Sequence, residues 1–446
     1  MNKKKVISEF SELVSIQSVS PDPKRFRELL EAAEFLSEKL KSLGFFVKKY
    51  GGEKAPPLLV AKLEASQNQK KARTVGIYGH YDVQPEDPLG EWKTPPFKLS
   101  KSKGRFWGRG VSDNKGPIIQ NLAAVENLIE RKELNSNTII VIEGEEESGS
   151  AHFEKFLKKA LPTVSKADAF YVTDVEMQHN CTPQIFYALR GLVYFELQIK
   201  TGKKDLHSGT YGNAVLNPAQ ALCEILSRMK CSKTGLINIP GFYKELKKVS
   251  PKESRLLRKT FHRAKEKEEA EVFEMCYSDK KEPHLSSKAR PSMDINGIFS
   301  GYTGEGAKTI IPHSATAKFS FRLVERQTPE RMEKLVRRFV EKNVPKEARF
   351  KLELLGKAAP FYTPPNSPFI KSTARVLSEV FGKETLLNRD GASIPAAEIL
   401  QRLLKKPVIL TGFANPGCNM HAPNENFSEI NFWKGIDALE RIYSRD

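Results

Sequence analysis

Histidine and acidic residues follow several short apolar segments of this sequence. An apolar run at residues 74–78 leads to His80, one at 138–142 leads to an acidic stretch, and one at 169–172 leads to an aspartate. Ligands of open α/β sheets bind at the carboxyl ends of the strands, so we expect these side chains to share one site. Two imidazoles and three carboxylates, without cysteine, suit Zn²⁺, Mn²⁺ or Co²⁺ better than Ca²⁺ or an iron–sulfur cluster. The candidate ligands are His80, Asp113, Asp174, His421 and a glutamate from the group Glu143, Glu146 and Glu147.

Each candidate also has an ordinary structural explanation. His80 fits a hydrogen-bonded core histidine, and Asp113 fits the N-cap of the helix that we predict after it. The acidic stretch fits a solvated turn, and Asp174 fits a turn-forming residue. Glu176, two residues further on, is a competing candidate for the role of metal ligand. The shared position at strand ends is what favours a single metal site.

The flanking sequence predicts the elements that must hold these residues. Before about residue 188, helical periodicity of three and four alternates with short apolar runs, which is typical of an α/β layer with a mostly parallel sheet. We predict helices at residues 25–43 and 117–131, and strands at 58–61, 74–78, 138–142 and 169–172.

The pattern changes after residue 188. Residues 189–358 predict a strand, a helix, a strand and a second helix, enough for a small α+β domain inserted into the larger one. The α/β pattern then returns, so we expect residues 1–188 and 359–446 to form one domain. The predicted elements are strands at 193–200, 315–324 and 407–411, and helices at 218–229, 329–344, 367–381 and 431–442.

Composition limits the cellular setting and the partners. The chain of 446 residues has a formal charge of +18, but basic and acidic residues are interleaved and no nucleic-acid motif accompanies them, so we do not expect nucleic-acid binding. No apolar run is long enough to span a membrane. Residues 1–8 lack the apolar stretch of a secretory signal, and the five cysteines form no CxxC pair. We expect a cytoplasmic protein with reduced thiols.

Six stretches, in this order along the chain, resemble the motifs of the M20 metallopeptidases, and most closely the carnosinase-type dipeptidases. The resemblance covers nearly the whole chain and implies a zinc-exopeptidase-like catalytic domain with an inserted α+β lid and dimerisation domain. The stretches are GHYDVQP (79–85), GRGVSDNKG (108–116), EGEEESGS (143–150), DLHSG (205–209), GAKTIIP (306–312) and RDGASIP (389–395).

The resemblance implies a role for each candidate in a two-metal site, with Zn²⁺ expected ahead of Mn²⁺ or Co²⁺. Asp113 would bridge the two ions. His80 and Asp174 would be the other ligands of one ion, and Glu147 and His421 the other ligands of the second. Glu146 would be the general base, and Asp82 would orient His80. The residues before His421 (415–420) differ from the Gly-rich approach that the family leads us to expect.

The resemblance also implies substrate contacts and a homodimer. His207 would reach the active site of the neighbouring subunit and stabilise the oxyanion. Arg322 would bind the C-terminal carboxylate of a peptide, a task that suits its planar guanidinium. Thr309 and Ser393 would make further substrate contacts.

The sequence therefore predicts a di-metal exopeptidase that cleaves dipeptides or short peptides. An N-acyl amino acid deacylase or related amidohydrolase would need the same metals and base, and only pocket residues would distinguish it. A non-catalytic basic binding protein on the same fold is the alternative from another class, and such a protein would have no reason to retain Glu146.

Overall fold

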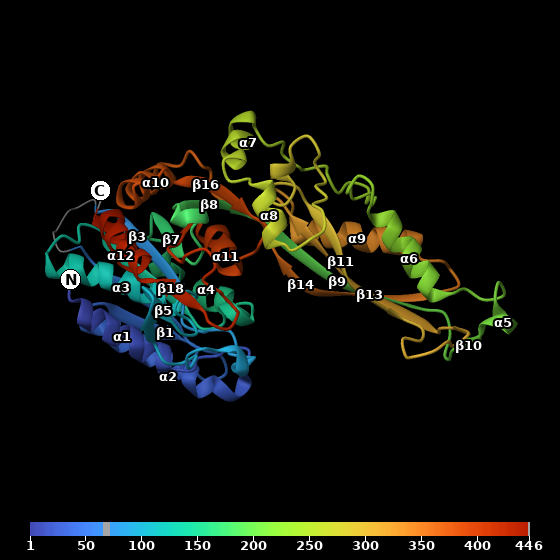
Figure 1. Ribbon diagram of the computed structural model, residues 1–446, viewed down its shortest axis with the longest axis horizontal. Helices are drawn as coiled ribbons and strands as arrows, with labels where there is room; N and C mark the ends of the chain where they lie inside the picture. The colour runs from blue at the N-terminus through green and yellow to red at the C-terminus, as the bar shows by residue number, and fades with distance from the viewer. Residues whose placement is uncertain (66–71, 445–446) are drawn as a thin grey trace. The chain divides into compact units, whose positions relative to one another are not determined.

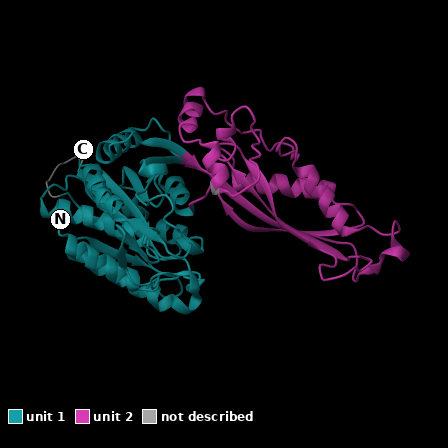
Figure 2. Cartoon of the chain, in the orientation of Figure 1, with its two compact units in different colours: residues 1–187, 363–388, 395–446 teal, residues 188–362, 389–394 magenta. Residues whose placement is uncertain are grey.

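The computed structural model describes residues 1–65 and 72–444, and the chain divides into two compact units (Figure 2). Unit 1 comprises Met1–Tyr187, Thr363–Asn388 and Pro395–Asp446, and unit 2 comprises Ala188–Tyr362 and Arg389–Ile394. The sequence pattern did not indicate the short return of residues 389–394 to unit 2.

Unit 1 is built on a central sheet whose four middle strands run parallel (Figure 1). The parallel pairs are β6 with β3, β3 with β7, and β7 with β17, while the flanking pairs are antiparallel. The predicted α/β fold with a parallel sheet core is confirmed. The first seven strands, in order across the sheet, are β1 (Phe46–Tyr50), β2 (Leu58–Leu63), β6 (Asn137–Glu143), β3 (Thr74–His80), β7 (Ala169–Thr173), β17 (Val408–Thr411) and β8 (Gln184–Leu189).

Helices cover both faces of this sheet. Tyr78 of β3 packs edge-to-face on Phe153 of α4 (Phe153–Val164), whereas a Cβ atom on Gly79 would lie 2.9 Å from Ile118 of α3 (Lys115–Glu130). Successive strand residues point to opposite faces, so α4 and α3 lie on opposite faces. The other helices of unit 1 are α1 (Lys3–Ser15), α2 (Phe26–Ser42), α10 (Pro368–Phe381), α11 (Pro395–Leu404) and α12 (Glu429–Ser444).

Local sequence sets several helix ends. Helix α10 starts with a proline at its first position and ends just before Gly382, whose φ of 68° is the left-handed conformation favoured by glycine. The same proline start occurs in α6 (Pro218–Met229) and α9 (Pro329–Asn343) of unit 2. These signals explain why the predicted starts of all three helices lie within one residue of the observed ones.

Unit 2 is centred on a four-stranded antiparallel sheet with α6 and α9 packed against it (Figure 1). Alternate residues of its two central strands are buried, and Phe195 pairs with Phe319 across them with ring centroids 5.6 Å apart. The four predicted elements are present as β9, α6, β13 and α9, but the two outer strands of the sheet, β11 and β14, were not predicted. In order the strands are β11 (Ser292–Ser300), β13 (Ser314–Leu323), β9 (Gly191–Lys200) and β14 (Arg349–Ala358).

Short elements complete the two units. In unit 1, β18 (Asn426–Ser428), β5 (Arg105–Trp107) and β4 (Ser100–Ser102) form a small sheet, and β16 (Leu386–Asp390) pairs with β8. Unit 2 adds the ribbon of β10 (Leu206–His207) and β12 (Ile310–Ile311), the strand β15 (Phe361–Tyr362), and the helices α5 (Ser208–Tyr211), α7 (Pro251–Arg258) and α8 (Arg263–Glu269).

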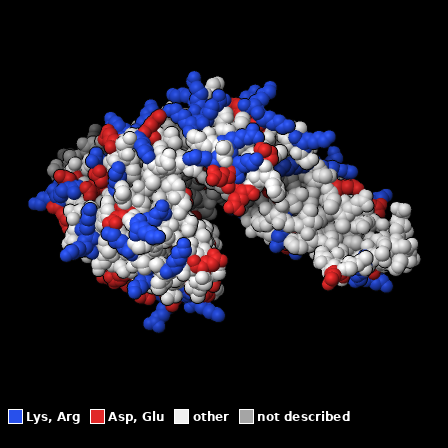
Figure 3. Space-filling model, viewed as in Figure 1, with Lys and Arg blue, Asp and Glu red and all other residues white. Residues whose placement is uncertain are grey.

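The surface carries charges of both signs. On the face shown in Figure 3, lysine and arginine side chains are interspersed with aspartate and glutamate on both units. Within the described part of the chain, we find no helix with both the length and the apolar character that a membrane span requires.

Candidate metal centre

The carboxyl ends of the four parallel strands carry or lead to the candidate ligands. His80 is the last residue of β3, and Asp174 directly follows β7. Glu147 lies in the single turn after β6, and His421 lies in the loop between β17 and β18. Asp113 lies two residues before α3. The sheet therefore brings residues that are up to 341 positions apart to one edge, as the strand-end pattern predicted.

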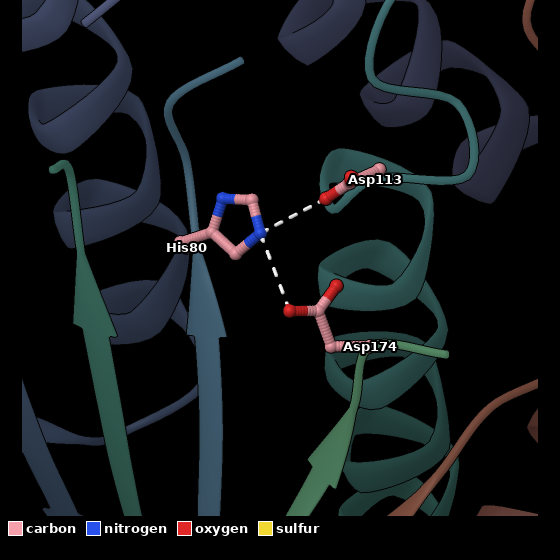
Figure 4. Close-up of side chains that lie close together, drawn as sticks. All are labelled: His80, Asp113 and Asp174. Atoms are coloured by element: carbon pink, nitrogen blue, oxygen red, sulfur yellow. Dashed lines mark ion pairs between the residues drawn. The ribbon is translucent and has the colours of Figure 1, made fainter. Parts of the chain in front are cut away.

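Three side chains form the first half of the cluster (Figure 4). His80 Nε2 lies 3.0 Å from Asp113 Oδ1 and 3.5 Å from Asp174 Oδ2. The His80 ring is fully buried. We call these three residues the inner half-site.

The second half shares Asp113 with the first. His421 Nε2 lies 2.9 Å from Asp113 Oδ2 and 3.2 Å from Glu147 Oε2. The His421 side chain is 56% exposed, whereas that of Glu147 is only 2% exposed. We call Asp113, Glu147 and His421 the outer half-site. The two oxygens of Asp113 face different imidazoles, which is the arrangement that a bridging carboxylate requires.

The close carboxylates shift the pKa values of both histidines. Hydrogen bonds to Asp113 and Glu147 raise the pKa of His421 to about 10. Burial of His80 acts to lower its pKa, but Asp174 and Asp113 outweigh burial and raise the pKa well above its ordinary value. The carboxylates therefore favour the protonated form of both imidazoles, whose positive charge offsets part of the negative charge of the cluster.

The pKa values of Glu146 and Glu147 shift in the opposite direction from that of Asp113. Burial and neighbouring carboxylates, Asp113 among them, raise the pKa values of Glu146 and Glu147. Asp113 is also buried, but its contacts with the two histidines hold its pKa below the ordinary value. The cluster thus holds more carboxylates than its two imidazoles can neutralise.

The atoms present fit divalent cations. His80 Nε2 is buried and makes no hydrogen bond of acceptable geometry, and Glu147 Oε1 is likewise buried without a hydrogen-bond partner. Buried polar atoms without partners are uncommon in proteins. Imidazole nitrogens and carboxylate oxygens are ligands of Zn²⁺, Mn²⁺ and Co²⁺, so the two half-sites would each hold one ion, with Asp113 between them.

Asp82 contacts both half-sites. The sequence predicted only its contact with His80. Its carboxylate Oδ1 lies 3.4 Å from His80 Nδ1, and its backbone oxygen lies 3.1 Å from the same nitrogen. The carboxylate also accepts the backbone N–H groups of Glu146 and Glu147, at 3.3 and 3.0 Å. One buried residue therefore contacts a ligand of the inner half-site and, through its carboxylate, holds the turn that carries Glu147.

Glu146 lies beside the cluster but belongs to neither half-site. Its backbone N–H is held by Asp82, and no side-chain hydrogen bond to its carboxylate is found among the described residues. Glu176, the competitor of Asp174, instead accepts a hydrogen bond from Cys418 Sγ at 2.9 Å. The structure thus groups Asp174, and not Glu176, with His80 and Asp113.

Two residues that orient ligands are not indicated by the sequence pattern. Asn114 Nδ2 donates to Asp174 Oδ1 at 2.7 Å, which leaves Oδ2 toward His80. Gln84 Nε2 donates to Glu147 Oε2 at 2.8 Å. Gln84 lies in the 79–85 motif and Asn114 in the 108–116 motif, but nothing in their spacing indicates which ligand each one contacts.

The four predicted substrate residues belong to unit 2. Arg322 Nη1 donates to Ser393 Oγ at 3.1 Å, and Ser393 Oγ donates to the backbone oxygen of Arg190 at 2.7 Å. His207 is the last residue of β10, and Thr309 directly precedes β12 in the same ribbon. Both residues are exposed. Arg322 and Ser393 are thus in direct contact, whereas His207 and Thr309 share the ribbon of β10 and β12.

The fold and the paired cation half-sites define a metallohydrolase, and comparison with known proteins gives its family. The model of peptidase family M20/M25/M40 matches residues 76–445. The chain belongs to this family, and is therefore a hydrolase of peptide bonds.

Two curated relatives cover almost the whole chain. A Cys-Gly metallodipeptidase of Candida albicans is 30% identical over 454 residues, covering 98% of this chain and 93% of the relative. A Beta-Ala-His dipeptidase of Rattus norvegicus is 28% identical over 461 residues, covering 99% of this chain and 93% of the relative.

Solved structures show the same fold over the same length. An M20 family metallo-carboxypeptidase from Sulfolobus solfataricus superposes with a TM-score of 0.85 at 30% identity and covers 98% of both chains. Human carnosine dipeptidase 1 superposes with a TM-score of 0.78 at 27% identity, covering 99% of this chain and 95% of the other.

Proposed function

We propose that the protein is a two-metal dipeptidase that hydrolyses dipeptides or short peptides with free termini. The observation that carries the proposal is the pair of half-sites that share Asp113. The names of its relatives as dipeptidases support the substrate class.

In this proposal His80, Asp113 and Asp174 hold one cation, and Asp113, Glu147 and His421 hold the other. Zn²⁺ is the expected ion, ahead of Mn²⁺ or Co²⁺, because a mixed set of imidazoles and carboxylates suits it. When bound, such a pair of ions acidifies a water molecule and polarises the scissile carbonyl.

Glu146 is the proposed general base. Its carboxylate lies next in sequence to a ligand, has no competing side-chain partner among the described residues, and is held in place through its backbone by Asp82. It accepts a proton from the attacking water and donates it to the leaving amine. Asp82 keeps the His80 ring oriented during this cycle.

Arg322 and Ser393 are the proposed contacts for the C-terminal carboxylate of the substrate. Among the described residues, no carboxylate lies within ion-pair distance of Arg322, and Ser393 is its hydrogen-bond partner. A half-buried guanidinium without an acidic partner is available to a substrate carboxylate.

Unit 2 is the proposed lid and dimerisation domain, and His207 and Thr309 would complete the active site of the partner subunit. Its strand β11 is an edge strand and exposes Ile298 and Phe299, which are 50% and 60% accessible. An exposed apolar edge of this kind is suited to pairing with a second copy. A cytoplasmic location is proposed because the five cysteines are free.

The direct test is a substrate screen of the purified protein with added Zn²⁺ or Mn²⁺. Dipeptides such as Cys-Gly and β-Ala-His, a longer peptide with a free C-terminus, and N-acyl amino acids should be compared by amino-group release. The proposal predicts cleavage of the dipeptides. Acyl release without dipeptide cleavage would instead assign the protein to the deacylases, and cleavage of the longer peptide alone would assign it to the carboxypeptidases.

A binding assay tests the non-catalytic alternative. A basic binding protein would retain DNA or an acidic polymer with a steep dependence on salt, and would hydrolyse none of the substrates. The proposal predicts hydrolysis and no such retention.

A further inference from the structure

The loop that carries Asp113 is folded around one buried carboxylate, that of Glu425. Glu425 Oε1 accepts the backbone N–H groups of Ser112 and Asp113, at 2.8 and 3.1 Å. Glu425 Oε2 accepts the backbone N–H of Gly110 and the Arg109 guanidinium, both at 2.9 Å. The Glu425 side chain is fully buried, so these four donors from one loop take the place of water.

The backbone of this loop is specialised for the contact. Gly110 has a φ of 86°, in the left-handed region that favours glycine. A Cβ atom on Gly110 would also lie only 2.8 Å from Val83 Cγ1. Glycine is therefore needed at the position whose N–H reaches Glu425.

Glu425 also joins the loops of the two half-sites. It lies four residues after His421 in the loop between β17 and β18, and its backbone oxygen accepts the N–H of Gly108 at 3.1 Å. Ser112 Oγ donates to the backbone oxygen of Asn426 at 2.9 Å. The segment that supplies His421 is thus fastened directly to the segment that supplies Asp113.

We infer that Glu425 is a positioning residue of the metal centre, whose carboxylate fixes the backbone of Asp113 and so places the shared ligand between His80 and His421. The inference rests on the proposed two-metal site. A carboxylate suits this position because it presents only acceptors, and all four groups facing it are donors. An amide would turn an NH₂ group toward donors, in either orientation, and leave some of them without a partner.

The test compares Glu425→Gln with a matched variant, Glu126→Gln. Glu126 is also a buried carboxylate of unit 1, but it pairs with Lys39 and Lys5 near the far end of α3. Zn²⁺ binding to the metal-free proteins is measured by calorimetry, with thermal unfolding and dipeptide kinetics on the same samples. Glu425→Gln is expected to weaken Zn²⁺ binding by about 10- to 100-fold and to lower kcat with little change in KM. Glu126→Gln should bind Zn²⁺ as the wild type does, even if it unfolds at a lower temperature.

The outcomes separate this inference from the proposed function. A wild-type protein that binds no Zn²⁺ would remove the two-metal site itself. A wild type that binds two ions, together with a Glu425→Gln variant of equal affinity, would overturn only the role of Glu425.

A conservative variant covers the case in which Glu425→Gln does not fold. Glu425→Asp keeps the charge but shortens the reach, and the inference predicts a folded protein with weakened Zn²⁺ binding. Unaltered affinity in Glu425→Asp would contradict the inference. Failure of both variants to fold, where Glu126→Gln folds, would assign Glu425 to folding and overturn it as well.

Discussion

The two half-sites share Asp113 but are built in different ways. The inner one takes His80 and Asp174 from the ends of β3 and β7, which are neighbours in the sheet. The outer one takes Glu147 from a single turn and His421 from a long loop. His80 is fully buried, whereas more than half of the His421 side chain is exposed.

The difference shows how much of each half-site the sheet itself determines. Paired parallel strands fix the inner ligands through regular hydrogen bonds. The outer ligands lie outside regular strands: Gln84 and Asp82 hold the turn of Glu147, and His421 lies in a loop that Glu425 fastens to the backbone of the shared Asp113. We therefore expect the outer half-site to lose its cation more readily.

Replacement of the shared ligand gives the largest expected effect. Asp113→Ala should lose both cations and all peptidase activity, because each half-site would keep only two of its three proposed ligands. Metal content by mass spectrometry and dipeptide hydrolysis check this. Retention of one tightly bound ion in the variant would show that the two half-sites are independent.

Removal of the proposed base comes next. Glu146→Gln should lower kcat by about 10²- to 10⁴-fold while both cations stay bound, because the amide cannot accept the proton. Glu145→Gln is the matched control on the same turn, since Glu145 interacts with His152 and not with the cluster. If Glu146→Gln keeps full activity, the base is another residue.

The orienting residues allow the two half-sites to be compared directly. Asn114→Ala removes the hydrogen bond to Asp174 Oδ1, and Gln84→Ala removes two hydrogen bonds to Glu147, one to Oε2 and one to the backbone oxygen. Loss of such a partner typically costs about 10- to 100-fold in metal affinity. In calorimetric titrations Gln84→Ala should weaken only the looser binding step, and Asn114→Ala only the tighter one. The reverse assignment would contradict the expected order of the half-sites.

The smallest expected effect is on the stability of the metal-free protein. Its carboxylate neighbours raise the pKa of His421 from 6.5 to about 10. A histidine whose pKa is higher in the folded than in the unfolded state stabilises the folded protein. This stabilisation is complete at a pH below the pKa of the unfolded state, and it is lost as the pH rises through the pKa of the folded state. The melting temperature of the metal-free protein should therefore fall between pH 7 and about 10, and His421→Gln should make this fall shallower. An equal fall in both proteins would exclude His421 as its source.

Much of the inner half-site could be predicted from the sequence. Apolar runs indicate strands, and the end of a parallel strand lies at a known edge of the sheet, so the pattern made His80 and Asp174 candidates; the family resemblance then gave them the role of ligands. The family resemblance separated Glu146 from Glu147, and the structure agrees in grouping only Glu147 with the ligands.

The contacts that hold the loops could not be predicted in this way. Glu425 lies 312 residues from Asp113, and periodicity reports which face of an element is buried, not which distant loop it contacts. Asn419 and His421 both adopt left-handed backbone conformations, with φ of 59° and 62°, so no regular pattern describes the His421 loop. The return of residues 389–394 to unit 2 was missed for the same reason.

Anomalous X-ray diffraction from crystals loaded with Zn²⁺ can show whether two cations share Asp113. We expect two peaks about 3.5–4 Å apart, one beside His80 and Asp174 and the other beside Glu147 and His421, with the Asp113 carboxylate between them. A single peak, or two peaks that Asp113 does not join, would contradict this expectation.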